Sequence, residues 1–75
     1  MNARELQDLL GDLLEELIFA RDDGDDDPLA ELAERTTPIK TLHTYDDVQM
    51  LTTDKGLVIE TEDGGEFHVT IVRSR

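Results

Sequence analysis

Leucine recurs between residues 6 and 18 at the spacing of one face of an α-helix. The positions are Leu6, Leu9, Leu10, Leu13, Leu14, Leu17 and Ile18. They predict a helix over residues 3–20, with Asn2 as its cap, Glu5 completing a capping box, and Gly11 on the polar side. At about 100° per residue, the apolar positions cover about half of the helix circumference. This arc is wider than the contact with a single neighbouring element requires. We therefore expect this helix to pack against two neighbours.

The opposite side of the predicted helix is acidic. It carries Glu5, Asp8, Asp12, Glu15 and Glu16, and Phe19 projects into the middle of them. One explanation of this aromatic residue is that the helix frays near Phe19, or that the next segment folds back over the ring. The other is that Phe19 is an anchor for a basic partner, rimmed by carboxylates.

Further aspartates follow the helix at Asp22, Asp23, Asp25, Asp26 and Asp27. Asp23, Asp25, Asp27 and Glu34 fit positions 1, 3, 5 and 12 of the calcium-loop template D-x-D-x-D-G-x5-E. However, Pro28 stands where the template needs glycine, and its fixed φ cannot supply a left-handed turn. The competing interpretation makes Asp27 the N-cap and Pro28 the first residue of a short helix over 29–33. We prefer this solvated helix–helix connection and expect no metal or cofactor.

Strand patterns begin after Pro38, which ends the helical part. Residues 39–44 predict an edge strand, and Thr53–Gly56 a turn. Residues 45–50 predict either one helical turn with a capping box from Thr44 to Asp47, or part of a strand over 48–52. The clearest strands are 57–61 and 66–72, which form a C-terminal hairpin around a three-residue loop with Gly64 left-handed.

That loop sets Ile59 opposite Phe67 and Leu57 opposite Val69. One face, turned toward the N-terminal helix, then holds Leu57, Ile59, Phe67, Val69 and Ile71, and the outer face holds Glu60, Glu66, His68 and Thr70. Val58 and Val72 also point outward, as ordinary exposed valines or, alternatively, as a second covered surface such as a dimer contact. The predicted fold is α+β: an N-terminal helical hairpin packed on a small three-stranded antiparallel sheet. We expect one domain over 1–75, with an acidic helical part (1–36) and a β-rich part (37–75).

The stretch YDDVQMLTTDKGLVIETEDGGEFHVTIVRS, residues 45–74, resembles the C-terminal part of small uncharacterised proteins of high-GC actinobacteria and their tailed phages. The matching positions are Tyr45, Leu51, Thr52, Gly56 to Val58, Asp63, Gly64, Glu66, Phe67 and Val69 to Val72. Gln49 and Met50 depart from this pattern, which has glycine before the L-T element. The resemblance covers less than half of the chain and implies no activity.

The net charge of −12, with nineteen acids against seven basic residues, excludes direct binding to nucleic-acid backbones or anionic membranes. Residues 1–36 hold twelve of these acids. The chain has no cysteine, so it has neither a disulfide framework nor a thiolate nucleophile. Met1 precedes a charged amphipathic segment, and no apolar run is long enough to span a bilayer, so we expect a cytoplasmic protein.

No constellation predicts catalysis, and we expect no enzyme. Ser74 is the only serine, and His43 and His68 lack the spacing of metal ligands. We expect a small non-enzymatic protein-interaction module, either a homodimer or bound to a basic protein. The alternative is a phage-type polyanion mimic that inhibits a nucleic-acid-binding host protein; a third explanation is halophilic acidity without a partner. The candidate partner-binding residues are Glu5, Asp8, Asp12, Glu15, Glu16, Phe19, Asp22, Asp23, Asp25, Asp26 and Asp27.

Overall fold

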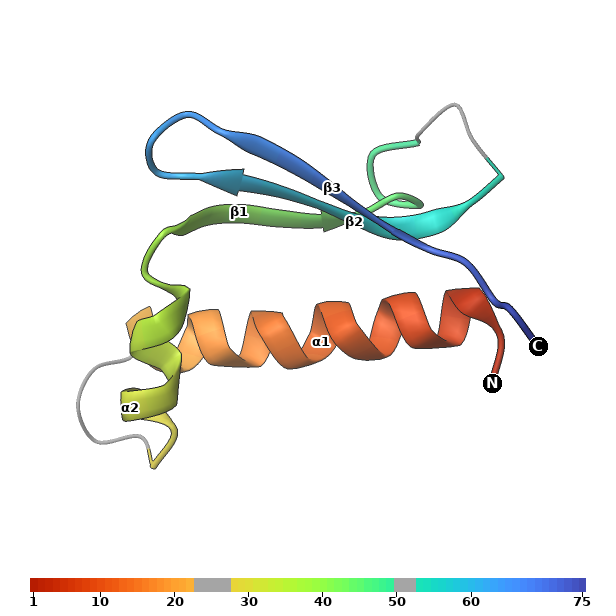
Figure 1. Ribbon diagram of the computed structural model, residues 1–75. Helices are drawn as coiled ribbons and strands as arrows, with labels where there is room; N and C mark the ends of the chain where they lie inside the picture. Colours follow the sequence, from red (N-terminus) through yellow and green to blue (C-terminus); the bar gives the residue numbers. More distant parts are fainter. Residues whose placement is uncertain (23–27, 50–52) are drawn as a thin grey trace.

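The chain folds into a long helix, a short helix and a three-stranded antiparallel sheet (Figure 1). This computed structural model describes residues 1–22, 28–49 and 53–75. The elements are α1 (Ala3–Asp22), α2 (Ala30–Ala33), the 3-10 turn η1 (Glu34–Thr36), β1 (Ile39–Thr44), β2 (Lys55–Thr61) and β3 (Glu66–Ile71). The α1 helix lies across one face of the sheet, so the α+β class predicted from the sequence is confirmed.

Helix α1 begins as its capping box predicts. The backbone N–H of Glu5 donates to Asn2 Oδ1 (2.8 Å), and the N–H of Asn2 donates to Glu5 Oε1 (3.2 Å). The helix ends at Asp22, two residues later than predicted. Arg21 in the last turn donates through Nη1 to the carbonyl oxygens of Thr36 (2.5 Å) and Ile39 (3.0 Å), which holds this end of α1 against the chain that enters β1.

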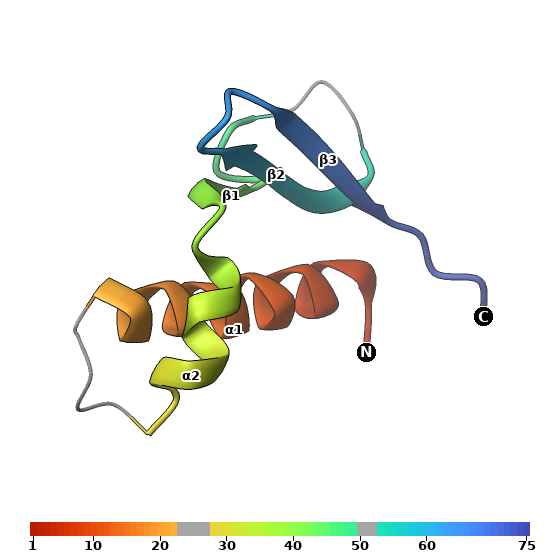
Figure 2. The ribbon, with the colours of Figure 1, turned by 60° about the vertical axis from the view of Figure 1, so that its left-hand side comes forward.

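Helix α2 is shorter than predicted. Leu29 is its N-cap, with φ −93°, so the assignment of Asp27 as cap and Pro28 as first helical residue was wrong. The first helical hydrogen bond runs from Ala33 N to Leu29 O (2.8 Å), and the chain then tightens into η1. The α2 helix packs beside the C-terminal end of α1 (Figure 2). Because residues 23–27 lie outside the described chain, the helical hairpin stays a prediction.

The strand order is β1-β2-β3, with both pairs antiparallel. Leu57 pairs with Val69 and Ile59 with Phe67, so the register predicted for the hairpin is confirmed. Its three-residue loop is closed by a hydrogen bond from Thr61 N to Gly65 O (2.9 Å). Gly64 has φ +88°, the left-handed conformation that this loop requires.

Residues 45–49 form a turn rather than a strand, which confirms the capping-box alternative for this part of the segment. Asp47 N donates to Thr44 Oγ1 (3.1 Å), and Thr44 N donates to Asp47 Oδ2 (3.4 Å). The predicted turn at 53–56 was wrong for its last two residues, because β2 already begins at Lys55, which pairs with Ile71. Residues 50–52 lie outside the described chain.

The contact between α1 and the sheet is centred on Gln7 and Gly11, both buried. A Cβ atom on Gly11 would lie 3.5 Å from Thr44 Cγ2 and 3.6 Å from Leu57 Cδ2. The placement of Gly11 on the polar, solvent-facing side was therefore wrong. Gly11 faces β1 and β2 with room for a methyl group, and the spacing of Leu14 and Ile18 continues the same face. The side of α1 that contacts the sheet therefore lies at one edge of the leucine arc and not at its centre.

The other face of the sheet is covered in part by Tyr45, which is 4% exposed. Its Oη lies 2.8 Å from Thr70 Oγ1, and its ring meets His68 edge-on, with ring centroids 6.2 Å apart. Val58 is buried on this face (6% exposed), so the preferred prediction of an ordinary exposed valine was wrong there. The turn after β1 folds Tyr45 back onto the sheet, which the strand pattern alone does not indicate. Val72 is exposed, as predicted.

Candidate functional site

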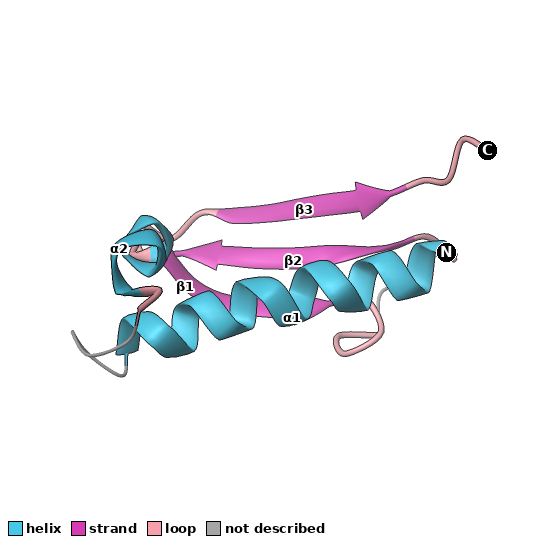
Figure 3. Cartoon of the chain, turned by 90° about the horizontal axis from the view of Figure 1, so that it is seen from below, coloured by secondary structure: helices cyan, strands magenta, loops and turns pink. Residues whose placement is uncertain are grey.

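Helix α1 leaves the apolar side of β3 uncovered. Phe67 and Val69 share a sheet face with Leu57, because β2 and β3 pair in register. Nevertheless, Phe67 is 57% exposed and Val69 43% exposed. Figure 3 shows the reason: α1 runs below β1 and β2, and β3 extends beyond it. The prediction that both side chains pack against the helix was therefore wrong, although their common face was predicted correctly.

The leucine arc of α1 begins beside this uncovered strand, where Leu6 lies near Ile71, and continues round the helix to Leu9 and Leu13, about 160° from the side that carries Gly11. Leu9 and Leu13 are 44% and 55% exposed, and Leu6 lines, together with Ile71, a hollow of about 340 Å³ at the N-terminal end of the helix. We call the combined region the apolar surface. It consists of Leu6, Leu9, Leu10, Leu13 and Leu17 of α1 and Phe67, Val69 and Ile71 of β3. Helix and strand meet at Leu6 and Ile71, which line the same hollow although they are far apart in sequence.

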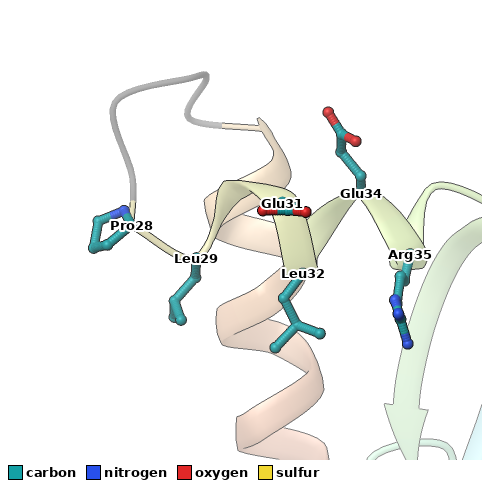
Figure 4. A pocket seen from close by; sticks show the side chains of 6 residues that line it. All are labelled: Pro28, Leu29, Glu31, Leu32, Glu34 and Arg35. Atoms are coloured by element: carbon teal, nitrogen blue, oxygen red, sulfur yellow. The ribbon is translucent and has the colours of Figure 1, made fainter.

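The α2 helix borders the apolar surface at its far end. Figure 3 places α2 beside the C-terminal end of α1, on the side where β3 runs. Leu29 and Leu32 are 46% and 49% exposed, and their side chains hang on one side of α2, whereas Glu34 points the other way (Figure 4). They line an open hollow of about 600 Å³ together with Pro28, Glu31, Glu34 and Arg35. The α2 leucines thus form a second exposed apolar patch.

The acidic side of α1 faces the opposite edge of the sheet. Asp8, Asp12 and Glu15 line a hollow of about 300 Å³ with Leu42 and Thr44 of β1. The predicted acidic residues of the helix are all exposed, but three have local roles. Glu5 forms the N-terminal capping box, Asp8 accepts a hydrogen bond from Gln7, and Asp22 pairs with Arg21 Nε at 3.1 Å. The predicted Asp23, Asp25, Asp26 and Asp27 lie outside the described residues.

Phe19 is 74% exposed on this acidic side. The helix continues past it to Asp22, so the fraying explanation was wrong. Within the described chain, its ring is not covered by a folded-back segment. The structure thus leaves Phe19 as an exposed aromatic residue on the side of the helix that carries Asp12, Glu15 and Glu16.

A buried amide that the sequence analysis missed joins α1 to the sheet. Gln7 is 0% exposed, its Oε1 accepts from Gly56 N (2.9 Å), and its Nε2 donates to Asp46 Oδ2 and Asp8 Oδ1 (both 3.1 Å). Asp46 also pairs with Lys55 Nζ at 2.7 Å and with Arg4 Nε at 3.3 Å. The hydrogen bond from Lys55, followed by that from Gln7, lowers the pKa of Asp46. A glutamine beside a leucine arc carries no signal of burial, so periodicity could not find it.

The Gln7 cluster is a structural junction. Both polar side-chain atoms of Gln7 and both carboxylate oxygens of Asp46 are engaged, and these contacts join α1, the turn after β1 and the start of β2. Among residues 1–22, 28–49 and 53–75, no group of His, Cys, Asp or Glu side chains is arranged to hold a metal ion. The aspartates of the calcium-loop alternative lie outside these residues. In the same part of the chain, the structure has no helix with the length and apolar character required to cross a membrane.

No family model, curated protein or solved structure matches this chain. The resemblance of residues 45–74 to actinobacterial and phage proteins therefore stays a prediction.

Proposed function

We propose that this chain is a non-enzymatic protein-interaction module that binds its partner through the apolar surface. The exposure of Leu9, Leu13, Phe67 and Val69 on neighbouring elements carries the proposal. Contiguous exposed apolar regions on small proteins mark sites of association. In this proposal, α1 and α2 act as a helical hairpin whose leucines form one wall of the site, and β3 forms the other. The cytoplasmic location expected from the sequence belongs to the same proposal.

The chain exposes more area than a monomer of its mass usually does, which supports binding to a partner. A monomeric protein of 8.5 kDa exposes about 4,700 Å² by the usual scaling with mass. This chain exposes 5656 Å², which is an excess of about 1,000 Å². Its radius of gyration, 13.4 Å, also exceeds the value of about 11.4 Å for a compact domain of this length. A partner on the apolar surface would reduce this excess, because it would cover side chains that the single chain leaves in water.

Site-specific photocrosslinking in the producing cell tests the proposal. A photoreactive phenylalanine analogue replaces Leu13 on the apolar surface or, as the matched control, Glu16 on the acidic side of the same helix. We expect discrete adducts from position 13 only, and we expect Phe67→Asp to abolish them, because Phe67 forms the second wall. Equal labelling from position 16, or adducts from position 13 that survive Phe67→Asp, would refute the proposal.

The exposed ring of Phe19 favours a second candidate function, the mimicry of a polyanion. Asp12, Glu15 and Glu16 remain exposed around it, and helix neighbours three or four residues apart lie about 5–6 Å from each other, comparable with phosphate spacing. Such a surface would bind a basic, nucleic-acid-binding protein. We expect that binding to weaken at high salt and to be lost when Asp12, Glu15 and Glu16 are all changed to neutral amides, whereas Phe67→Asp should leave it intact.

A further inference from the structure

The two edges of the sheet differ in how they are protected against pairing with another strand. Edge strands are commonly blocked by proline, lysine or a β-bulge. The β1 edge has two of these, because Lys40 lies in the strand and the register shifts between Ile39 and Thr41, and Pro38 directly precedes it. By contrast, the β3 sequence EFHVTI contains neither proline nor lysine and pairs with β2 without a shift. The β3 edge is therefore the one that remains available for strand addition.

The direction of the β3 backbone groups follows from the hairpin. Gly65 turns its carbonyl toward β2, where it accepts from Thr61 N. Because backbone groups of successive strand residues point to alternate edges, Phe67 and Val69 also face β2. His68 and Thr70 then direct their N–H and C=O groups to the open edge of the sheet.

On the basis of the proposed function, we propose that the partner is a second copy of this chain. Its β3 strand pairs antiparallel with β3 of the first copy, about a two-fold axis at Val69. This register sets Phe67 opposite Ile71 of the second copy, and Val69 opposite its own equivalent. All three apolar residues of β3 that face the helix layer then meet apolar residues. His68 exchanges backbone hydrogen bonds with Thr70 of the second copy, and Glu66 lies opposite Val72 rather than opposite another acid.

The same axis brings the leucine arcs of the two α1 helices toward each other beneath the joined β3 strands. They enclose the Phe67 and Val69 side chains of both copies, while Asp8, Asp12 and Glu15 stay on the far side of each helix, toward β1. The negative charge of these three residues is thereby kept away from the contact. The excess exposed area, about 1,000 Å², is close to the share of about 800 Å² that each partner buries in a standard interface. Shared two-fold contacts of this kind close the assembly at two copies.

Engineered cysteines test both the partner and the register, because the natural chain has no cysteine. Val69→Cys places two thiols on the axis, where directly opposed Cβ atoms lie about 4.5–5.5 Å apart, and we expect rapid formation of a covalent dimer under mild oxidation. Val72→Cys is the matched control. It is more exposed than Val69 (74% against 43%), yet two copies of position 72 would be about 20 Å apart in this register. We expect no disulfide from it at the same protein concentration.

Sedimentation velocity of the unmodified chain gives the second readout, with an expected mass of about 17 kDa, twice the 8.5 kDa of one chain. Val69→Lys should shift this mass to that of one chain, and Val48→Lys, an equally exposed valine in the turn after β1, should not. A single-chain mass at all concentrations, or equal oxidation of the two cysteine variants, overturns the second-copy proposal. If position 13 still crosslinks to a different protein, the proposed function stands; if it crosslinks to nothing, both proposals fail.

Discussion

Replacement of Gly56 by alanine should destabilise the protein strongly, because β2 and β3 leave no room for a side chain there. A Cβ atom at this position would lie 2.1 Å from the carbonyl oxygen of Val69 and 2.8 Å from Cζ of Tyr45. Ordinary contact begins near 3.4 Å, so the strands would have to separate by about 1.3 Å. Neither the backbone oxygen nor the buried ring can rotate out of the way.

The magnitude follows from two costs. Overpacking of a filled site typically costs 1–3 kcal/mol, and loosened hydrogen bonds between buried backbone groups add about 1 kcal/mol or more. We expect Gly56→Ala to lower the free energy of unfolding by about 3 kcal/mol. At about 4–8 °C per kcal/mol for a domain of this size, the midpoint of thermal unfolding should fall by roughly 10–25 °C.

Gly11→Ala is the matched control, because a Cβ atom there meets its nearest neighbours at 3.5 and 3.6 Å, which is ordinary contact. Alanine is also the better helix former by about 1 kcal/mol, so this variant should be as stable as the natural chain or slightly more stable. Thermal and urea unfolding followed by circular dichroism, at one protein concentration, measures both variants. A Gly56→Ala protein as stable as the natural chain would show that β3 does not pass this close to β2. A destabilised Gly11→Ala protein would show that α1 lies closer to Thr44 and Leu57 than these distances.

Three further substitutions test the contacts between α1 and the rest of the chain. Gln7→Met leaves the buried Gly56 N–H without its acceptor and should lower the free energy of unfolding in urea by about 2 kcal/mol. Asp8→Asn is its control, because it changes only an exposed partner of Gln7, and should lower that free energy by less than about 0.5 kcal/mol. Arg21→Met removes the donor to Thr36 O and Ile39 O and should cost about 2 kcal/mol; an unchanged stability would mean that these bonds do not hold the end of α1. The lowered pKa of Asp46 means that its ionised form stabilises the fold above its unfolded pKa, near 3.8, and that this stabilisation is lost as the pH falls through the lower folded value. Unfolding curves of Asp46→Asn and the natural chain should therefore differ near neutral pH and converge in acid, and a constant difference across pH would contradict this linkage.

Local signals in the sequence were sufficient for several elements of the fold. Asn2 and Glu5 predicted the start of α1 because a capping box depends only on neighbouring residues. The β2–β3 register followed from matching apolar residues across a short loop, and Gly64 supplied the left-handed residue that such a loop needs. These features depend on contacts between residues that are close in sequence.

The rotation of α1 could not be predicted in the same way. An apolar arc over half of the helix fits the sheet in several orientations. The structure selects the one in which Gly11 faces Thr44 and Leu57 and Gln7 satisfies Gly56 N–H. Both of these requirements come from residues more than thirty positions away in the sequence. The exposure of Phe67 and Val69 follows from the same choice, because it places the helix below β1 and β2. We therefore place the proposed contact on the apolar side, and the acidic partner-binding residues stay a prediction.

Tyr45 gives this chain an internal optical reporter. It is the single tyrosine, and tryptophan is absent, so near-ultraviolet absorption and emission arise from one ring whose position is known, apart from the weak contribution of two phenylalanines. That ring lies on the sheet face opposite α1, with its hydroxyl bound to Thr70 and its edge against His68. Unfolding of the sheet can thus be followed without a label and compared with the loss of helix in the far ultraviolet. Coincident transitions would show that the two layers melt as one cooperative unit.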